Sequence, residues 1–457
     1  MCGGDAMSVK GVTHNDDHAT ATVSVLSEQM SFLDKLESDY TQNAFETRER
    51  KKIIKKSDMI PRNKQDNYSH EFIGKRREWL AEKTGANLLH VGQYSIDPEG
   101  LKSRVENMVG SVQIPLGVAG PLKVNGEYAN GLFYVPLATT EGTLVETYQR
   151  GMMAITMSGG AITRVVKDAL SFSPVFFMES LASMPTFINW IKGHFNEIKA
   201  VAESTTVHGK LNEIVPYILG RRVMLDFRYF TGDAMGLNMV SIATDKACNY
   251  IMERTDAVEY YLASNLSSDK KVSFFNFING YGKEVAVEVT FPRDIMLKYL
   301  GMTPEDIYDF WHIAFLGGCQ AGMVGINGHF ANALAAVFMA CGQDVAQTVN
   351  ASSGVNICEI TGQGDLRMTL KLPNIVIGTV GGGTSTETAK ECLEMLGCYG
   401  EGKARKLAEI IGATLLAGEI AIMAAFSSGN FVRAHINRRG ASQKPQKTTL
   451  TTEAQHA

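Results

Sequence analysis

Two long apolar runs constrain the fold of this chain more than any other feature of its sequence. No Asp, Glu, Lys or Arg occurs between Phe310 and Gln343, a stretch long enough to cross a bilayer. Amide side chains and a histidine interrupt this run, and Gly and Ala dominate it, which favours a fully buried helix in a large core. A second run, 410–426, carries Glu419 in its middle and is interpreted in the same way. We therefore expect a cytoplasmic protein with no membrane partner.

Composition and charge narrow the class of protein. The 457 residues have a mean hydropathy of -0.05 and are 20% charged, which is typical of a soluble globular chain with roughly two to four domains. The net charge of -4 argues against nucleic acid or an anionic membrane surface as the main partner. The seven cysteines are scattered and never spaced as Cys-x-x-Cys. We therefore expect buried thiols in a reducing compartment, with no disulfide framework and no metal site.

The order of strand and helix signals predicts an α+β fold. Apolar residues alternate in "VMLDFRYF" (223–230) and "KEVAVEVTF" (283–291), as in half-buried strands. We also expect "FFNFI" (274–278) to be the first strand of a hairpin that turns at "NGYGK". Helical patterns at 303–315 and 404–425 interleave with these strands without a regular βαβ alternation. Residues 1–27 and 439–457 are polar and predicted to be disordered tails, and 28–85 a charged helical segment.

Four short motifs carry side chains suited to acid–base or electrostatic catalysis. "SDKK" (268–271) places Lys270 before an apolar run, where a solvated turn is the alternative. "ATTEG" (138–142) contains Glu141, which would also suit a helix N-terminus. "GQDVAQ" (342–347) ends the uncharged run with Asp344, a carboxylate that is costly to bury unpaired. "RAH" (433–435) ends in His435, which titrates near neutral pH.

These side chains match the needs of acyl thioester reduction by hydride. Lys270 would stabilise the oxyanion that develops on the carbonyl oxygen. Glu141 beside Asp344 would act as an acid for the aldehyde oxygen, because two close, buried carboxylates raise one pKa. His435 would protonate the departing thiolate. From the residues alone, this is one of many assemblies that can be drawn.

In their order along the chain, the motifs closely resemble the 3-hydroxy-3-methylglutaryl-CoA reductase family. They are "ENMVGSVQIPLGVAGPL" (106–122), "ATTEG", "GDAMGLNM" (232–239), "SDKK", "GQDVAQ", "GTVGGGT" (378–384) and "RAH". The resemblance runs from about residue 75 to 438 and is strongest to soluble archaeal and related bacterial members. It implies a four-electron reduction of the acyl-CoA by two NADPH, through a hemithioacetal and an aldehyde, to mevalonate and CoA.

The resemblance also implies an architecture. It predicts a large substrate- and CoA-binding domain, 86–172 and 264–438, around a long buried central helix. A small ferredoxin-like domain for NADP(H), 173–263, would be inserted into it. The family forms homodimers or dimers of dimers with active sites at the subunit interface, so we expect a homo-oligomer.

Site residues follow by matching this sequence to the family's motifs. The implied catalytic residues are Glu141, Lys270, Asp344 and His435, with Asp269, Lys271 and Asn327 around the acyl group. Tyr148 and Arg150 lie in a segment that matches a CoA contact. The implied nucleotide-binding residues are Asp233, Ala234, Met235, Gly236, Asn238, Thr206, Lys210, Gly381 and Gly382. The expected cofactor is NADPH, with NADH not excluded.

Several positions depart from the family's pattern. Ala263 stands in place of a serine that contacts the acyl group, and Phe172 in place of an arginine that holds its free carboxylate. Val207 replaces an arginine near the 2′-phosphate of the nucleotide. Losing an Arg–carboxylate bond typically costs a few kcal/mol of binding. Three hypotheses follow: the ordinary substrate held by Arg164 or Lys271 instead, a less acidic acyl thioester on CoA or a carrier protein, or an inactive CoA- or nucleotide-binding homologue.

Overall fold

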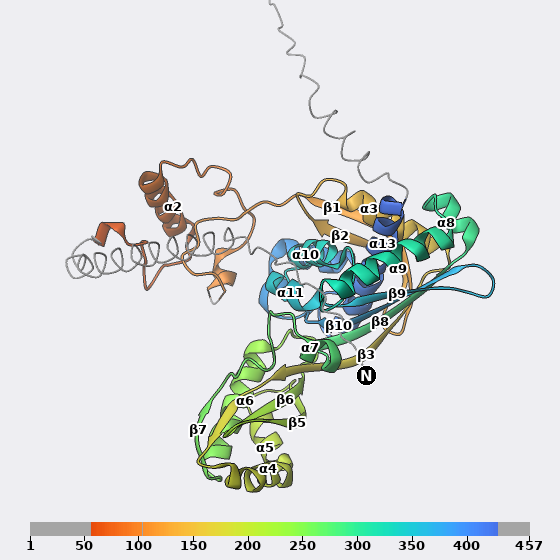
Figure 1. Ribbon diagram of the computed structural model, residues 1–457. Helices are drawn as coiled ribbons and strands as arrows, with labels where there is room; N and C mark the ends of the chain where they lie inside the picture. The colour runs from red at the N-terminus through yellow and green to blue at the C-terminus, as the bar shows by residue number, and fades with distance from the viewer. Residues whose placement is uncertain (1–55, 103, 428–457) are drawn as a thin grey trace, which may run out of the picture. The chain divides into compact units, whose positions relative to one another are not determined.

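The computed structural model describes residues 56–102 and 104–427 (Figure 1). The chain divides into two units, one up to Asn87 and one from Leu88 onward. In the first unit, helix α2 (His70–Thr84) follows the short 3₁₀ turn η2 (Lys56–Asp58). The hydroxyl of Ser69 accepts a hydrogen bond from the amide of Phe72 and so caps the start of α2. The predicted tails 1–27 and 439–457, and residues 28–55, lie outside the described residues.

The second unit is a ten-stranded mixed sheet with helices packed on it, so the α+β prediction is confirmed. Its main path runs β7-β4-β6-β3-β8-β10-β9. The strands are β1 (Leu116–Gly126), β2 (Asn130–Ala138), β3 (Ala161–Phe172), β4 (Val175–Met178), β5 (Lys210–Leu219), β6 (Arg222–Phe230), β7 (Ala257–Tyr261), β8 (Gly282–Phe291), β9 (Val355–Ile360) and β10 (Leu366–Ile375). The helices are α3 (Leu144–Met157), α4 (Met184–Gly193), α5 (Phe195–Glu203), α6 (Leu237–Met252), α7 (Phe274–Asn279), α8 (Arg293–Tyr299), α9 (Pro304–Gln320), α10 (Phe330–Ala340), α11 (Thr348–Ala351), α12 (Glu387–Met395) and α13 (Ala404–Ser427).

Strand β3 connects two hydrophobic cores (Figure 1). Its first part pairs with β8 over the larger core, which α3, α10 and α13 cover. Its last residues pair with β6 in a smaller lobe of β4–β7 and α4–α6. In that lobe β4 pairs with β7 and β6, and β5 pairs with the other edge of β6, giving the order β7-β4-β6-β5. The predicted strands 223–230 and 283–291 are confirmed as β6 and β8.

Helix α13 is the centre of the larger core. It is the one described helix with the length and apolarity of a membrane span, but 83% of its apolar window is buried inside the protein. The two carboxylates that interrupt it are both fully buried. Glu409 accepts hydrogen bonds from the backbone amides of residues 127–129, in the turn between β1 and β2. Backbone donors from a distant loop therefore satisfy a charged group within an apolar helix.

Three sequence expectations need correction. The run 310–343 is not one buried helix, because α9 ends at Gln320 and α10 begins at Phe330, and Ile313 of α9 is 70% exposed. "FFNFI" is helix α7 rather than a strand, since the hydroxyl of Ser273 caps it by accepting a hydrogen bond from the amide of Asn276. Cys319 is exposed, whereas the other described cysteines are buried and free.

Candidate active site

Lys270 lies on a loop between β7 and α7 whose backbone is unusual. Asn265, Ser268 and Lys270 all have positive φ, at 67°, 50° and 55°. Non-glycine residues rarely adopt this left-handed conformation, and it persists only where surrounding contacts hold it. Three such residues within six positions mark the loop as a site whose conformation is fixed by its neighbours.

Two buried amides hold this loop from inside the protein. The side-chain amide of Asn276, on α7, donates to the carbonyl of Ser267 at 2.9 Å. The amide of Asn350, on α11, donates to the carbonyl of Ser268 at 3.1 Å. Both amides are almost completely buried, so their hydrogen bonds with the loop are shielded from competing water.

The ammonium of Lys270 is paired with Asp344. Its Nζ lies 2.8 Å from Oδ2 of Asp344, while Oδ1 of the same carboxylate accepts a hydrogen bond from the amide of Ala346. The hydrogen bond to Asp344 raises the pKa of Lys270, although burial lowers it in part. Lys270 is therefore a cation at neutral pH. Its side chain is 40% exposed and that of Asp344 25%, so a ligand can reach the ammonium.

Asp269 faces the protein interior. Its Oδ1 accepts hydrogen bonds from the hydroxyl of Tyr281 at 2.9 Å and from the amide of Gln347 at 2.7 Å. Burial, with the nearby Asp269 charge, raises the pKa of Tyr281 well above its ordinary value, so this phenol stays a donor. Lys271 is exposed, and its Nζ donates to the backbone carbonyl of Asp269. Asp269 therefore anchors the loop, and Lys270 and Lys271 remain at the surface.

Glu141 lies beside the first turn of α10. Its Oε2 accepts a hydrogen bond from the amide of Asn332 at 2.8 Å. Together with Ala335 and Met339 on the same face of α10, these two residues line an open hollow of about 430 Å³. The hydroxyl of Thr139 accepts a hydrogen bond from the amide of Glu141 and caps no helix, since Thr143 precedes the first residue of α3.

Within one chain Glu141 and Asp344 do not meet. Glu141 contacts Asn332 near the start of α10, whereas Asp344 follows the end of that helix at Ala340. Eight residues of helix separate these two levels, a rise of about 12 Å. Within the chain Asp344 pairs with Lys270, and a close pair of Glu141 and Asp344 stays a prediction for the assembled protein. His435 lies outside the described residues.

The two glycine-rich turns pack against each other, backbone to backbone. A Cβ on Gly378 would lie 2.6 Å from the amide nitrogen of Met235, so only glycine permits this contact. Gly236 has a φ of 92° and leads into α6. Gly381 and Gly382 also have positive φ, and no other part of the described protein lies within 4 Å of a Cβ at either position.

The carboxylate of Asp233 is occupied within the protein. It accepts hydrogen bonds from three backbone amides at the start of α13, those of Gly402, Lys403 and Ala404, at 2.7, 3.0 and 3.0 Å. Its own backbone carbonyl accepts a hydrogen bond from the amide of Thr379. Asp233 therefore caps the central helix and joins the two glycine-rich turns.

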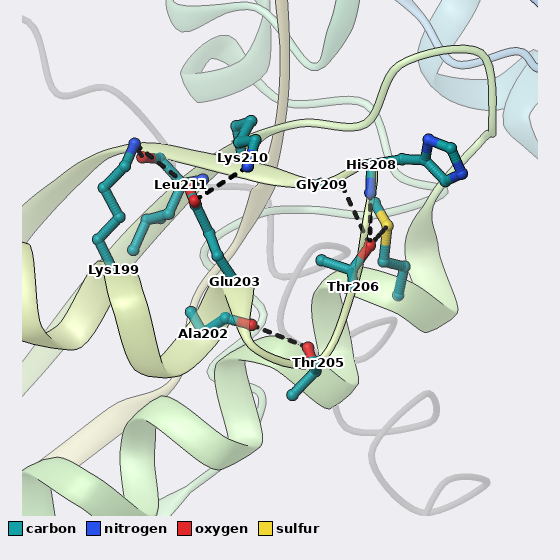
Figure 2. A network of polar contacts seen from close by, with 10 residues as sticks. Lys199, Ala202, Glu203, Thr205, Thr206, His208, Gly209, Lys210 and Leu211 are labelled. Atoms are coloured by element: carbon teal, nitrogen blue, oxygen red, sulfur yellow. Dashed lines mark hydrogen bonds and ion pairs between the residues drawn. The ribbon is translucent and has the colours of Figure 1, made fainter.

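Figure 2 shows the loop between α5 and β5. The hydroxyl of Thr206 accepts hydrogen bonds from the amides of His208 and Gly209 and donates to Sδ of Met239 on α6. This contact fixes the loop beside the start of α6. Val207, which lies between Thr206 and His208 in the chain, has 85% of its surface exposed.

A carboxylate pairs with two lysines that flank this loop, one on α5 and one at the start of β5. Glu203 lies 3.2 Å from Nζ of Lys199 and 3.3 Å from Nζ of Lys210, and it accepts a hydrogen bond from the amide of Leu211 (Figure 2). Burial raises the pKa of Glu203, but the hydrogen bonds from Leu211 and the two lysines outweigh it and lower the pKa below its ordinary value. Lys210 is therefore balanced by a local negative charge.

Comparison with known proteins identifies the family of this chain. The model of the family "Hydroxymethylglutaryl-coenzyme A reductase" matches residues 73–439. The chain is 46% identical over 368 residues to the 3-hydroxy-3-methylglutaryl-coenzyme A reductase of Methanocaldococcus jannaschii, which covers 79% of this chain and 91% of the relative. It is 45% identical over 370 residues to that of Pyrococcus abyssi, with 79% and 90% covered. The chain belongs to the hydroxymethylglutaryl-coenzyme A reductase family.

A solved structure agrees with the family's fold. The class II 3-hydroxy-3-methylglutaryl-CoA reductase from Streptococcus pneumoniae, whose structure is bound to NADPH, superposes with a TM-score of 0.60. The match covers 77% of this chain and 96% of the other, at 18% sequence identity. At that identity the likeness concerns the fold alone.

Not every residue matched to the family's motifs has a free polar group. Tyr148 is fully buried, and its hydroxyl donates to the carbonyl of His329 at 2.7 Å while the two rings stack. Arg150 donates to the carbonyl of Ala421. The amide of Asn327 donates to the carbonyls of Ser352 and Gly354. In this member of the reductase family these side chains hold neighbouring segments together.

The residues that depart from the reductase family's pattern lie in different environments. Phe172 packs against the core of the small lobe. On the opposite face of β3, the hydroxyl of Ser171 donates to buried Asp226, which also pairs with Arg228 at 2.8 Å. Ala263 is exposed, and the exposed Arg164 donates to the carbonyl of the preceding residue. Phe172 is thus a partly buried residue that packs against the core of the small lobe in this structure.

Sequence reasoning missed the residues that support the site. They are Asn276, Asn350, Gln347 and Tyr281, which contact the loop that carries Lys270, and Asn332 beside Glu141. The available signal was a polar amide within an otherwise apolar or helical run, as in "FFNFI". Among residues 56–102 and 104–427, no group of three His, Cys, Asp or Glu side chains is placed to hold a metal ion.

Proposed function

We propose that this protein reduces 3-hydroxy-3-methylglutaryl-CoA to mevalonate and free CoA. The observation that carries the proposal is the Lys270–Asp344 pair, a cation held by a carboxylate on a loop open to ligand. The named relatives at 46% and 45% identity support the choice of substrate. Because Lys270 is present, charged and accessible, the inactive homologue is the weaker alternative.

The reaction consumes two hydrides and two protons. The first hydride adds to the thioester carbon, and the resulting hemithioacetal collapses to an aldehyde with loss of the CoA thiolate. The second hydride converts the aldehyde to the primary alcohol. In both steps negative charge develops on the same oxygen, and Lys270 would stabilise it electrostatically. Glu141 would supply the proton to the aldehyde oxygen and His435 the proton to the thiolate.

A reduced nicotinamide nucleotide, when bound, would supply the hydrides. The residues fit such a group, because Gly381 and Gly382 leave open space beside the turn that Gly236 ends. We propose that the lobe of β4–β7 and α4–α6 is a ferredoxin-like nucleotide-binding domain, which the order β7-β4-β6-β5 and the two intervening helical segments support. NADPH is the proposed nucleotide and NADH the alternative, since Val207 adds no positive charge to the loop.

The proposed assembly is a homo-oligomer in the cytoplasm with active sites between subunits. Its support is that Glu141 contacts the start of α10 and Lys270 pairs with Asp344 beyond the end of that helix, so a second chain would bring a Glu141 and a Lys270 together. An exposed apolar strip on β1 and β2 offers a surface for that contact. The strip comprises Leu116 and Val118 of β1 and Leu132 and Tyr134 of β2, which are 45–56% exposed.

Turnover of the purified protein tests this function. We expect oxidation of NADPH with 3-hydroxy-3-methylglutaryl-CoA, followed at the nicotinamide absorbance. Lys270→Ala should abolish turnover, whereas Lys298→Ala, which removes a surface lysine of α8, should leave it unchanged. Activity that survives Lys270→Ala contradicts the proposed role of this ammonium.

A second candidate substrate has one observation in its favour. Apolar side chains follow the lysine loop at the surface: Val272 is 46%, Phe274 62% and Ile278 70% exposed. Such neighbours suit a less acidic acyl group, carried on CoA or on a carrier protein. A panel of monoacyl-CoA thioesters in the same assay decides between the two, because turnover confined to 3-hydroxy-3-methylglutaryl-CoA rules this candidate out.

A further inference from the structure

The buried carboxylate of Glu419 holds the start of α10. Both oxygens of Glu419 accept a hydrogen bond from the amide of Gly328 at 3.0 Å, and Oε1 also accepts one from the amide of His329. Oε2 accepts another from the side-chain amide of Asn356. His329 is the N-terminal cap residue of α10, and its own side chain makes no capping hydrogen bond. Glu419 therefore supplies, from α13, the hydrogen-bond acceptors for the start of α10 that the side chain of His329 does not provide.

The residue that Glu419 holds also anchors the other helix beside Glu141. The carbonyl of His329 accepts the hydrogen bond from Tyr148 of α3, and the two rings stack with centroids 5.1 Å apart. Tyr148 packs closely against α13, because a Cβ on Gly418 would lie 2.3 Å from its ring. Helices α3, α10 and α13 thus meet at His329.

Glu141 is connected to this junction from both sides. It precedes α3 by three residues, and its carboxylate accepts a hydrogen bond from Asn332, in the first turn of α10. A displacement of the start of α10 therefore moves Asn332 relative to α3 and changes the position of the Glu141 carboxylate. Misplacement of a catalytic group by about 1 Å lowers the rate by about 100-fold.

We propose that Glu419 is a positioning residue, which fixes the start of α10 and through Asn332 sets the place of the Glu141 carboxylate. This inference rests on the proposed function, in which Glu141 supplies a proton during reduction. Glutamine has the same shape as glutamate but only one acceptor oxygen, and its NH2 group would face donors. Glu419→Gln therefore removes acceptors at the junction without creating a cavity.

The same helix provides a matched control. Glu409 is also fully buried in α13, and it accepts hydrogen bonds from three backbone amides of the turn between β1 and β2, where Glu419 accepts from two backbone amides and one side-chain amide. Ten residues, about 15 Å of helix, separate it from Glu419. Glu409→Gln therefore makes the same chemical change away from Glu141.

The experiment compares Glu419→Gln with Glu409→Gln in the full chain. We expect both variants to fold with a cooperative thermal transition. Glu419→Gln should lower kcat by about 10- to 100-fold with KM for the acyl-CoA changed by less than about two-fold, and Glu409→Gln should leave kcat within about two-fold. Asn332→Ala should lower kcat as Glu419→Gln does, and the double variant should lower it no further. An equal loss of kcat in the Glu419 and Glu409 variants, or additive losses with Asn332→Ala, overturns the proposal.

Hydrogen exchange separates this proposal from the proposed function, because it needs no turnover. In Glu419→Gln the amides of 328–334 should exchange faster than in the unmodified protein, and in Glu409→Gln those of 127–129. Unchanged exchange at 328–334 overturns the positioning role even if the enzyme is active. Faster exchange there without any turnover by the unmodified protein places the failure in the proposed function.

Discussion

The ionisation of Glu419 should make the stability of this protein depend on pH in a defined direction. Burial raises the pKa of Glu419 to about 7 from an ordinary value of 4.5, although hydrogen bonds from Gly328, His329 and Asn356 lower it in part. The folded protein therefore binds this proton more tightly than the unfolded chain. The resulting stability is fully present below pH 4.5 and is lost as the pH rises from 4.5 to 7.

The size of this effect follows from the same two values. The difference between about 7 and 4.5 corresponds to about 3 kcal/mol of unfolding free energy, at 1.36 kcal/mol for each pH unit. Glu419→Gln cannot ionise, so its stability lacks this contribution. Relative to the unmodified protein, the variant should gain about 3 kcal/mol between pH 4.5 and pH 8.

Urea unfolding of both proteins across this pH range measures the difference. Other titrating groups affect the two proteins alike and cancel when the curves are subtracted. Tyr148 and Cys358 are the other titratable side chains that sense the Glu419 charge, and burial raises the pKa of both above neutrality. They therefore do not titrate in this range. Parallel stability curves for Glu419→Gln and the unmodified protein would refute the reasoning.

Three further predictions follow from the packing and the charges. Gly151→Ala should lower the free energy of unfolding by about 1–3 kcal/mol, because its Cβ would lie 1.9 Å from a backbone carbonyl of α13. Gly317→Ala should not lower it, because the space around Gly317 is open. Chemical unfolding measures both variants. Asp344→Asn should move the basic limb of the kcat/KM profile to lower pH, since it weakens the hydrogen bond and removes the negative charge that raise the pKa of Lys270. The shift should stay below about one pH unit because the pair is partly exposed, and an unmoved limb contradicts this reasoning. Val207→Arg should lower KM for NADPH by about 10-fold, since an added guanidinium can pair with the 2′-phosphate. KM for NADH should stay unchanged. Equal effects on the two KM values contradict the placement of the loop between α5 and β5 near the 2′-phosphate.

The elements that the sequence predicted well are those whose signal lies within the residues of a single strand or helix. β6 and β8 follow from alternation, because every second residue faces the core, and α13 follows from a long apolar run. The wrong prediction of a strand at "FFNFI" also has a local cause. Ser273 caps a helix there, and five apolar or amide residues do not distinguish a short helix from a strand.

The contacts of the carboxylates could not be predicted, because their partners are distant in sequence. Glu419 was recognised as an interruption of an apolar run, but its backbone donors lie 91 and 90 residues earlier in the chain and its side-chain donor 63 residues earlier. Asp344 was expected to act on both Glu141 and Lys270, and within the chain it pairs with Lys270, since a sequence does not show which end of α10 each loop reaches. Hydrophobic patterns fix which residues are buried, whereas these pairings depend on how the elements are arranged.

A family motif names the residues at a site, and only their contacts show which of them are free to act. In "GDAMGLNM" the carboxylate of Asp233 accepts hydrogen bonds from three backbone amides at the start of α13, so its loss would disturb the central helix. In "SDKK" two adjacent residues differ in this respect. Asp269 accepts hydrogen bonds from Tyr281 and Gln347, whereas Lys270 keeps an exposed ammonium. We therefore expect a loss of activity on substituting Asp233 or Asp269 to come with a loss of stability, and a loss on substituting Lys270 to leave stability unchanged.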